Sequence, residues 1–328
     1  MITSRTKQYL GPKMNVDRDT SPAKVAADFE PEPAAKHSTK PKIIYVMGAG
    51  RSGSTIFGVA LGNCGSIFDA GELEAWLRRS GVPNHGGAER ARFWASVQDR
   101  VTGGADLFGD DAWRCLEHSS SLLRVDRWPR RRLLRNRYRQ IAEELYRAVV
   151  EVSGTANIVD TSHYPLRVRE LQALSNIDLY LIYLVRDAQD VVASFDRRNV
   201  DQEPKSPAAT NLYLWMTHLL SVVIFLRHPR DRRLFVRHED FMRSPERVLG
   251  DVLARIEVPA GVPDLTALRT GIPFQGNRLL RAEVLALRND ASPGKRRVTK
   301  LVQSPWTIVH SRLRPSASPS RASKRGAP

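Results

Sequence analysis

The residues best able to do chemistry form one glycine-rich stretch, Gly48-Ala49-Gly50-Arg51-Ser52-Gly53-Ser54-Thr55. The apolar run before it, Lys42 to Met47, is typical of a buried strand, and the run after it, Ile56 to Leu61, is typical of a helix start. A strand, a glycine-rich turn and a helix in this order place backbone N–H groups and a helix N-terminus around one anion. The stretch therefore predicts a phosphate-binding loop; the alternative is a Gly/Ser-rich turn without a ligand.

The spacing fits the phosphate loop G-x-x-x-x-G-K-[ST] at every fixed position except one, because Ser54 stands where lysine is expected. That lysine normally reaches the β- and γ-phosphates of a nucleoside triphosphate. A loop that keeps the cradle and lacks the lysine indicates a nucleotide with a different 5′ end. The candidate binding residues are Gly50, Arg51, Ser52, Gly53, Ser54 and Thr55.

A second candidate site follows the clearest strand pattern of the sequence, Asp178 to Val185. Arg186 ends this strand, Asp187 is the expected cap of the next helix, and Ser194 follows on that helix. A charged fork and a neutral donor are the groups that bind a phosphate. Taken alone, Arg186 beside Asp187 is better explained as an ion pair at a strand end, but the upstream loop favours phosphate binding.

Together, these two segments resemble the sulfotransferase superfamily, whose members move a sulfuryl group from 3′-phosphoadenosine-5′-phosphosulfate (PAPS) to an acceptor. The resemblance covers roughly residues 41–310. It implies that Gly50 to Thr55 bind the 5′-phosphosulfate and that Arg186 and Ser194 bind the 3′-phosphate. It also implies that PAPS is the donor substrate and that no metal is required.

Three further stretches extend the resemblance. Val159-Asp160-Thr161-Ser162-His163 is similar to the family's Asp-Ser-Ser-Lys segment, so His163 takes the place of a lysine that acts on the transferred group; a hydrogen-bonded turn histidine is the alternative. Val236 to Phe241 resembles an Arg-Tyr-Glu-Asp-Leu element with a structural role. A late loop resembles Gly-Asn-Pro-x-Arg, which closes over the nucleotide, and which arginine faces the ligand stays open; its candidates are Gly276, Asn277, Arg278 and Arg281.

The implied reaction is an in-line transfer in which negative charge builds on the leaving phosphate. The loop amides and Arg51 would stabilise that charge. Glu72, in a Gly-Glu pair after the loop, is the expected general base, and the alternative is a carboxylate favoured at a helix N-terminus. Glu74 is a weaker candidate for the base.

Charge and composition set the remaining alternatives. The 328 residues carry a net charge of +16, and residues 291–328 hold nine Lys or Arg and no acid. Eight arginines between Arg124 and Arg139 are either a solvated helix face or a patch that attracts an anionic or sugar acceptor. A P-loop kinase or NTPase is disfavoured by Ser54, and a basic nucleic-acid-binding protein is disfavoured because no recognised binding motif is present.

The alternation of strands and helices predicts an α/β fold with a doubly wound, mostly parallel sheet and flanking helices. We expect disordered segments at 1–40 and 311–328, a sulfotransferase domain at 41–310, and one long helix from Phe241 to Ile256. Cys64 and Cys115 are predicted to be free thiols. The apolar run from Leu219 to Leu226 is too short to cross a bilayer, and we expect a cytoplasmic protein. The acceptor (a sugar, a glycolipid or a small metabolite) and the oligomeric state are left open.

Overall fold

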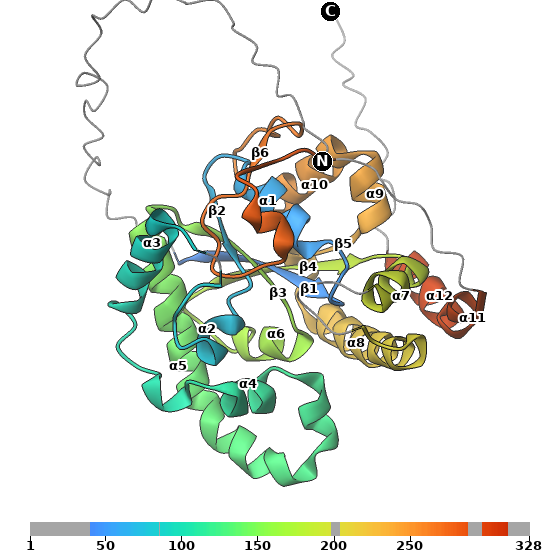
Figure 1. The fold of residues 1–328 in the computed structure, drawn as a ribbon, viewed down its shortest axis with the longest axis horizontal. Coiled ribbons are helices and arrows are strands. Elements are labelled where there is room, and N and C mark those ends of the chain that lie inside the picture. Colours follow the sequence, from blue (N-terminus) through green and yellow to red (C-terminus); the bar gives the residue numbers. More distant parts are fainter. Residues whose placement is uncertain (1–39, 85, 198–203, 288–296, 314–328) are drawn as a thin grey trace, which may run out of the picture. The chain divides into compact units, whose positions relative to one another are not determined.

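A five-stranded parallel sheet forms the centre of the fold (Figure 1). The computed structural model describes residues 40–84, 86–197, 204–287 and 297–313, all of which belong to one compact unit. The strands are β1 (Lys42–Gly48), β2 (Ile67–Gly71), β3 (Asn157–His163), β4 (Asp178–Val185) and β5 (Arg233–Arg237). Their order is β2-β3-β1-β4-β5, so the chain leaves β1 toward one edge and later returns to the other side of β1. The predicted doubly wound fold is confirmed.

Twelve helices are found in the described ranges. They are α1 (Ser54–Gly62), α2 (Ala75–Arg78), α3 (Ala88–Gln98), α4 (Asp110–Leu116), α5 (Trp128–Ser153), α6 (Pro165–Leu171), α7 (Ala188–Asp196), α8 (Pro207–Arg227), α9 (His238–Arg243), α10 (Pro245–Ile256), α11 (Arg297–Val302) and α12 (Ser304–Leu313). A small antiparallel pair, β6 (Leu268–Arg269) and β7 (Val284–Leu285), and a 3₁₀ turn, η5 (Arg278–Arg281), follow α10.

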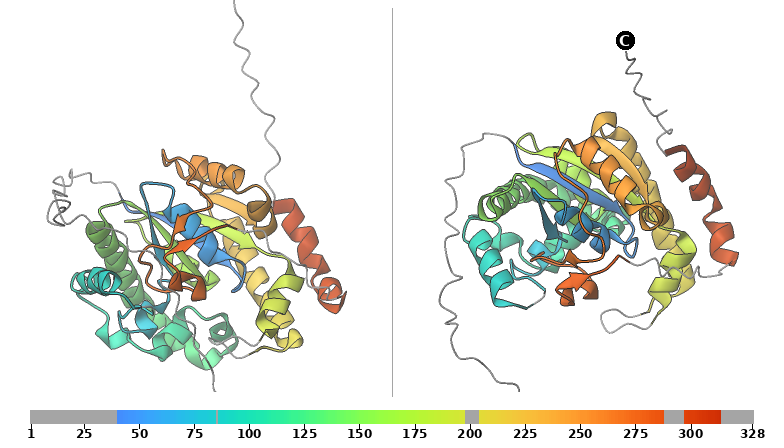
Figure 2. Two further views of the ribbon diagram at one scale, coloured as in Figure 1. Left: turned by 45° about the horizontal axis from the view of Figure 1, so that its top comes forward. Right: turned by 90° about the horizontal axis from the view of Figure 1, so that it is seen from above.

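Helices cover both faces of the sheet, as the two further views show (Figure 2). Along β1, Ile43 and Tyr45 enter one core with α5 and α8, whereas Ile44 and Val46 enter a second core with α1 and α10. Side chains of a strand alternate between faces, so a strand covered on both sides must be apolar at almost every position. The uninterrupted apolar pattern of β1 has this cause.

Two predicted helices are wrong in their bounds. The helix expected from Phe241 to Ile256 is two helices, α9 and α10, because Pro245 begins the second and cannot continue the first. The helix start that was the alternative for Glu72 lies later, at Ala75, because β2 continues to Gly71. Glu72 therefore follows a strand and does not lie at a helix N-terminus.

Helix α8 is long and apolar enough, by length and composition, to cross a membrane. In the fold it packs against α6, α7, β1 and β4, and its Thr210, His218 and Ser221 are buried. The buried face of the helix therefore belongs to the core, whereas Leu219, Val223 and Leu226 are exposed, so the predicted buried run is only partly buried. Both cysteines are free and buried, which confirms that prediction.

Candidate functional site

The predicted site residues that follow the strands gather at the carboxyl ends of four of them. The phosphate-binding loop follows β1, Glu72 follows β2, His163 ends β3 and Arg186 follows β4. His238, which the sequence did not indicate as a site residue, follows β5. In a parallel sheet these ends share one edge, and ligands bind there where the strand order reverses. The reversal lies at β1, so the loop occupies the position where a nucleotide is expected.

Left-handed backbone shapes the loop itself. Arg51 has a φ of 67° and Gly53 a φ of 91°. A side chain at Gly53 would be strained by this conformation and would also overlap the imidazole of His238. Gly53 is the N-cap of α1 and has no side chain to accept hydrogen bonds from the first amides of the helix, so these amides are left for a ligand.

Tyr213 on α8 contacts the loop, which the sequence did not reveal. Its hydroxyl accepts a hydrogen bond from the Gly50 amide at 2.8 Å. The Arg51 guanidinium lies 5.9 Å from the centre of the Phe195 ring on α7. Both contacts join the loop to α7 and α8 on the side opposite Glu72's strand.

Arg186 lies against the loop. Its Nη1 donates to the carbonyl oxygen of Arg51 at 3.3 Å, while its Nε is enclosed without a hydrogen-bond partner in the described residues. Asp187 accepts a hydrogen bond from the Gln189 amide, which confirms it as the cap of α7. Since Asp187 caps this helix, the ion pair between Arg186 and Asp187 is not the role that the structure supports. Ser194 lies half-buried on α7.

Four enclosed polar atoms around the loop have no hydrogen-bond partner in the part of the chain that the structure describes. They are Ser52 Oγ, His163 Nδ1, Arg186 Nε and His238 Nδ1. Leaving such an atom unpaired in a folded protein costs about 1–3 kcal/mol, and each calls for an explanation such as a bound ligand or water. Their grouping around one loop supports an anion site there.

His163 and Glu72 lie near each other. A Cβ placed on Gly50 would lie 3.9 Å from His163 Nε2, so the imidazole faces the loop. Burial lowers the pKa of His163, and the charge of Glu72 raises it by a smaller amount. His163 is therefore neutral at pH 7 and does not reproduce the charge of the lysine that it replaces.

Glu72 is fixed by the late loop. Its amide donates to the carbonyl oxygen of Gln275 at 2.8 Å, and its Oε2 accepts from Gln275 Nε2 at 3.3 Å. Glu74 is buried, and burial followed by the nearby charge of Glu72 raises its pKa well above the ordinary value. A carboxyl that keeps its proton is a poor base at neutral pH, which favours Glu72 over Glu74.

The late loop closes over the start of α1. A Cβ on Gly276 would lie 3.4 Å from Thr55 Cγ2, and the side chain of Asn277 accepts from the Leu279 amide to begin η5. Arg278 and Arg281 both lie in η5 with exposed side chains. The structure brings this loop to the site and leaves the choice between the two arginines open.

Three of the eight arginines in the arginine-rich stretch have a structural role. On α5, Arg131, Arg135 and Arg139 all bind the fully buried carboxylate of Glu170 on α6, at distances of 2.9–3.4 Å. These residues recur every four positions and so lie on one face of the helix. This face is buried against α6, so the prediction of a solvated face is wrong for these three residues. His85 lies outside the described residues, and no cluster of metal-ligating side chains is found within them.

Several solved structures resemble this fold, and all are sulfotransferases. The sulfotransferase domain from the curacin biosynthetic pathway is 18% identical, with a TM-score of 0.46 over 82% of this chain and 98% of that chain. The sulfotransferase domain from the Synechococcus PCC 7002 olefin synthase is 17% identical, with a TM-score of 0.46 over 84% and 98%. A sulfotransferase from Alicyclobacillus acidocaldarius is 16% identical, with a TM-score of 0.39 over 73% and 87%.

No curated protein matches the sequence. The model of the sulfotransferase family, in contrast, matches residues 41–264, which is more than half of the chain and includes the loop, Glu72, His163, Arg186 and His238. The chain belongs to the sulfotransferase family.

Proposed function

We propose that this protein transfers a sulfuryl group from PAPS to a hydroxyl group of a small-molecule, glycan or lipid acceptor. The observation that carries this proposal is the set of four enclosed, unpartnered polar atoms around the loop after β1. The missing lysine of that loop supports a donor that is not a nucleoside triphosphate.

The donor would lie with its 5′-phosphosulfate on the loop. The amides at the start of α1 and the hydroxyls of Ser52, Ser54 and Thr55 are the available donors. Arg51 is the nearest candidate for stabilising charge on the leaving phosphate, because the loop holds no lysine. The guanidinium of Arg186 and the hydroxyl of Ser194 would hold the 3′-phosphate.

The acceptor would approach from the side of Glu72. Glu72 would take the proton of the acceptor hydroxyl, and neutral His163 would donate a hydrogen bond to the transferred group. The His163 ring stacks on the Tyr164 ring, with 4.4 Å between the ring centres. The centre of the Trp113 ring lies 5.9 Å from that of Tyr164. A cytoplasmic location stays a prediction.

Nucleotide binding tests the donor directly. Adenosine 3′,5′-bisphosphate should raise the melting temperature strongly, 5′-AMP weakly, and ATP with Mg²⁺ no more than 5′-AMP. Equal stabilisation by all three nucleotides would contradict the proposal. Labelled PAPS with a panel of sugars, glycolipids and small alcohols would then identify the acceptor, with a boiled sample as the control.

A further inference from the structure

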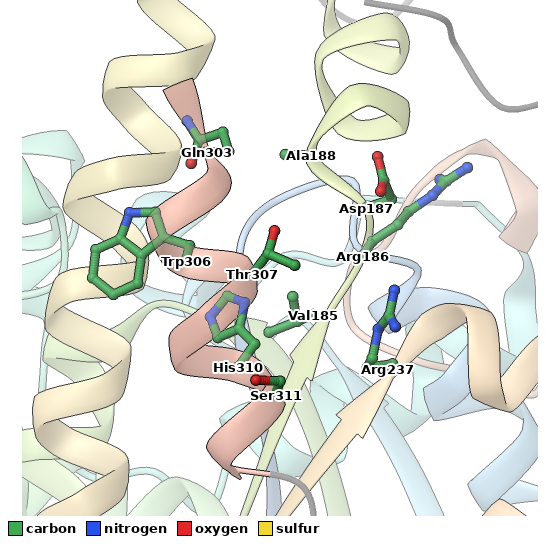
Figure 3. Close-up of a pocket in the computed structure, with 10 residues that line it drawn as sticks. All are labelled: Val185, Arg186, Asp187, Ala188, Arg237, Gln303, Trp306, Thr307, His310 and Ser311. Atoms are coloured by element: carbon green, nitrogen blue, oxygen red, sulfur yellow. The ribbon is translucent and has the colours of Figure 1, made fainter. Parts of the chain in front are cut away.

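The two sides of the candidate site are built differently. Beside Arg186, a cavity of about 220 Å³ lies between the ends of β4 and β5 and helix α12 (Figure 3). On the side of Glu72, buried hydrogen bonds instead join the segment after β2 to the end of β3. A buried hydrogen-bond network holds its members in one arrangement, so this second side can fix the geometry of the groups that act on an acceptor.

Ser162 is the side chain that makes this link. It is fully buried on β3, and its Oγ accepts a hydrogen bond from the Glu74 amide at 2.9 Å. The Glu72 amide, two residues earlier, donates to the Gln275 carbonyl at 2.8 Å. The short backbone segment that carries Glu72 is therefore held at both ends, by the late loop at one end and by Ser162 at the other.

Asp160 fixes the hydroxyl of Ser162. Its Oδ1 accepts from the Ser162 amide at 2.9 Å and also from the Ser162 hydroxyl. Because this hydroxyl donates its one proton to Asp160, it presents a lone pair to the Glu74 amide. Asp160 is itself fully buried, and its Oδ2 accepts from the Tyr146 hydroxyl at 2.6 Å and lies 3.4 Å from Arg167 Nη2. Both carboxylate oxygens of Asp160 are therefore engaged.

The turn after Ser162 carries His163. His163 has a φ of 55°, in the left-handed region that residues other than glycine seldom adopt, and such backbone persists only where surrounding contacts determine it. The Tyr164 amide donates to the Ser162 carbonyl at 2.7 Å, and the Tyr164 carbonyl accepts from the Tyr45 hydroxyl at 3.0 Å. Ser162 thus contacts the Glu72 segment through its side chain and the His163 turn through its backbone.

We infer that Ser162 is a positioning residue for sulfuryl transfer, with Asp160 as the group that fixes its hydroxyl. Ser162 holds the backbone of Glu72 so that the carboxylate reaches the acceptor hydroxyl beside the loop. Because it is fully buried, Ser162 itself contacts neither substrate. The inference rests on the proposed function, in which Glu72 is the base, and the sequence indicated a role in this stretch only for His163.

Turnover in a double-mutant cycle tests this inference. Labelled PAPS is the donor, and the acceptor is the compound of the panel above that the wild type sulfates fastest. Ser162→Ala should lower kcat by about 10- to 100-fold and leave the affinity for adenosine 3′,5′-bisphosphate within about twofold, because it displaces a reacting group and not the nucleotide. In the Glu72→Gln background the same substitution should lower kcat by less than about threefold, since no base is left to position.

Ser121→Ala is the matched control. Ser121 is also a buried serine whose hydroxyl accepts a hydrogen bond, but its donor is Nη1 of Arg131 in the structural group on α5, at 3.2 Å. This variant should lower the melting temperature to a similar extent as Ser162→Ala and keep kcat within about twofold of the wild type. If Ser162→Ala does not fold, Ser162→Cys, which fills the same space with a weak acceptor, takes its place with the same expectations.

The outcomes separate this inference from the proposed function. If the wild type transfers no sulfuryl group from PAPS to any compound of the panel, the proposed function and the inference fail together. If Glu72→Gln keeps the wild-type rate, Glu72 is not the base, and the inference fails with that part of the proposed function. If Glu72→Gln is slow but Ser162→Ala stays within about threefold of the wild type, or lowers kcat by the same factor in both backgrounds, only the inference is overturned.

Discussion

Three arginines on α5 and Arg186 at the end of β4 both bind oxygen atoms, but their roles differ. On α5, Arg131, Arg135 and Arg139 converge on Glu170, whose two carboxylate oxygens are both engaged. At the end of β4, Arg186 makes one hydrogen bond to a carbonyl and keeps an enclosed Nε without a partner in the described residues. The first group has its anion within the protein, whereas no ion pair of Arg186 is found in the described part of the chain.

The difference shows that the density of basic residues does not locate an anion site. The stretch from Arg124 to Arg139 is the most arginine-rich of the chain, yet its buried members join two helices. Arg186 stands beside an acid in the sequence, yet it faces the loop. Position beside the loop, together with an enclosed donor that has no acceptor in the described residues, is the better guide, because such a donor is costly unless a ligand or water supplies one. The unpaired donor alone does not locate a site, since Arg167 Nε in a buried ion-pair cluster also has no acceptor there.

The largest expected effect belongs to the site. Glu72→Gln should lower the turnover rate by about 10²–10⁴ and leave nucleotide affinity unchanged, because the amide keeps the size of the side chain and cannot accept the proton. Steady-state rates and titration with adenosine 3′,5′-bisphosphate on one preparation measure both quantities. A variant within threefold of the wild-type rate would remove Glu72 as the base, and Glu89→Gln, at an exposed position of α3, is the control.

Loss of the ion pairs between α5 and Glu170 should lower the stability of the fold. Glu170→Gln should lower the free energy of unfolding by about 3–5 kcal/mol, because it leaves three arginines without their buried counter-charge. Urea unfolding measures this loss, and Glu151→Gln, in an exposed pair with Arg100, should lose less than about 1 kcal/mol. If Glu170→Gln instead kept its stability and lost nucleotide affinity, the two groups would not differ as described.

Arg186→Ala should show the opposite pattern. We expect affinity for adenosine 3′,5′-bisphosphate to fall by about tenfold to a hundredfold, the loss of one charged hydrogen bond, with a small change in stability. Isothermal titration and thermal melting measure the two effects. Arg247→Ala, which removes an exposed arginine on α10, should alter neither. A large loss of stability without loss of affinity would place Arg186 with the structural arginines.

A dependence of stability on pH is expected from two buried histidines. Burial lowers the pKa of His218 to about 3 and of His310 to about 4, both below the ordinary value of 6.5. The unfolded chain therefore binds more protons below pH 6.5, and stability present above that pH is lost as the pH falls toward 4. As the pH falls through this window, each histidine should lower the free energy of unfolding by about 1.4 kcal/mol per pH unit. Urea unfolding between pH 7 and pH 5 tests this, and a shallower pH dependence is expected for His310→Asn.

The sequence predicts those parts of the fold that depend on the residues of one continuous segment. Asp178 to Val185 is a strand with the predicted bounds, because an apolar, β-branched and aromatic run has no other place than a buried sheet. The loop after β1 was predictable because its glycines and its flanking runs are adjacent in the chain. The break at Pro245 was also readable, since proline begins helices and does not continue them.

The rest of the site depends on contacts between distant segments. His238 lies in an element interpreted as structural, and only the position of β5 beside β4 brings it to Gly53. Its position directly after a predicted strand was the available signal. Tyr213 had no such signal, because a tyrosine on an apolar helix is ordinary core and its hydrogen bond to Gly50 arises from helix packing.

Helix α8 holds two distant parts of the molecule at once. Near its start Tyr213 binds the Gly50 amide, and farther along His218 binds the Tyr183 hydroxyl that also contacts His310 on α12. Backbone amides exchange slowly only while the hydrogen bonds that hold their segment remain formed. The loop and α12 are both connected to α8 by these hydrogen bonds. A nucleotide that makes the loop more rigid should therefore also slow amide exchange along Ser304–Leu313. The carboxyl-terminal helix would then report occupancy of a loop that lies some 250 positions earlier in the chain.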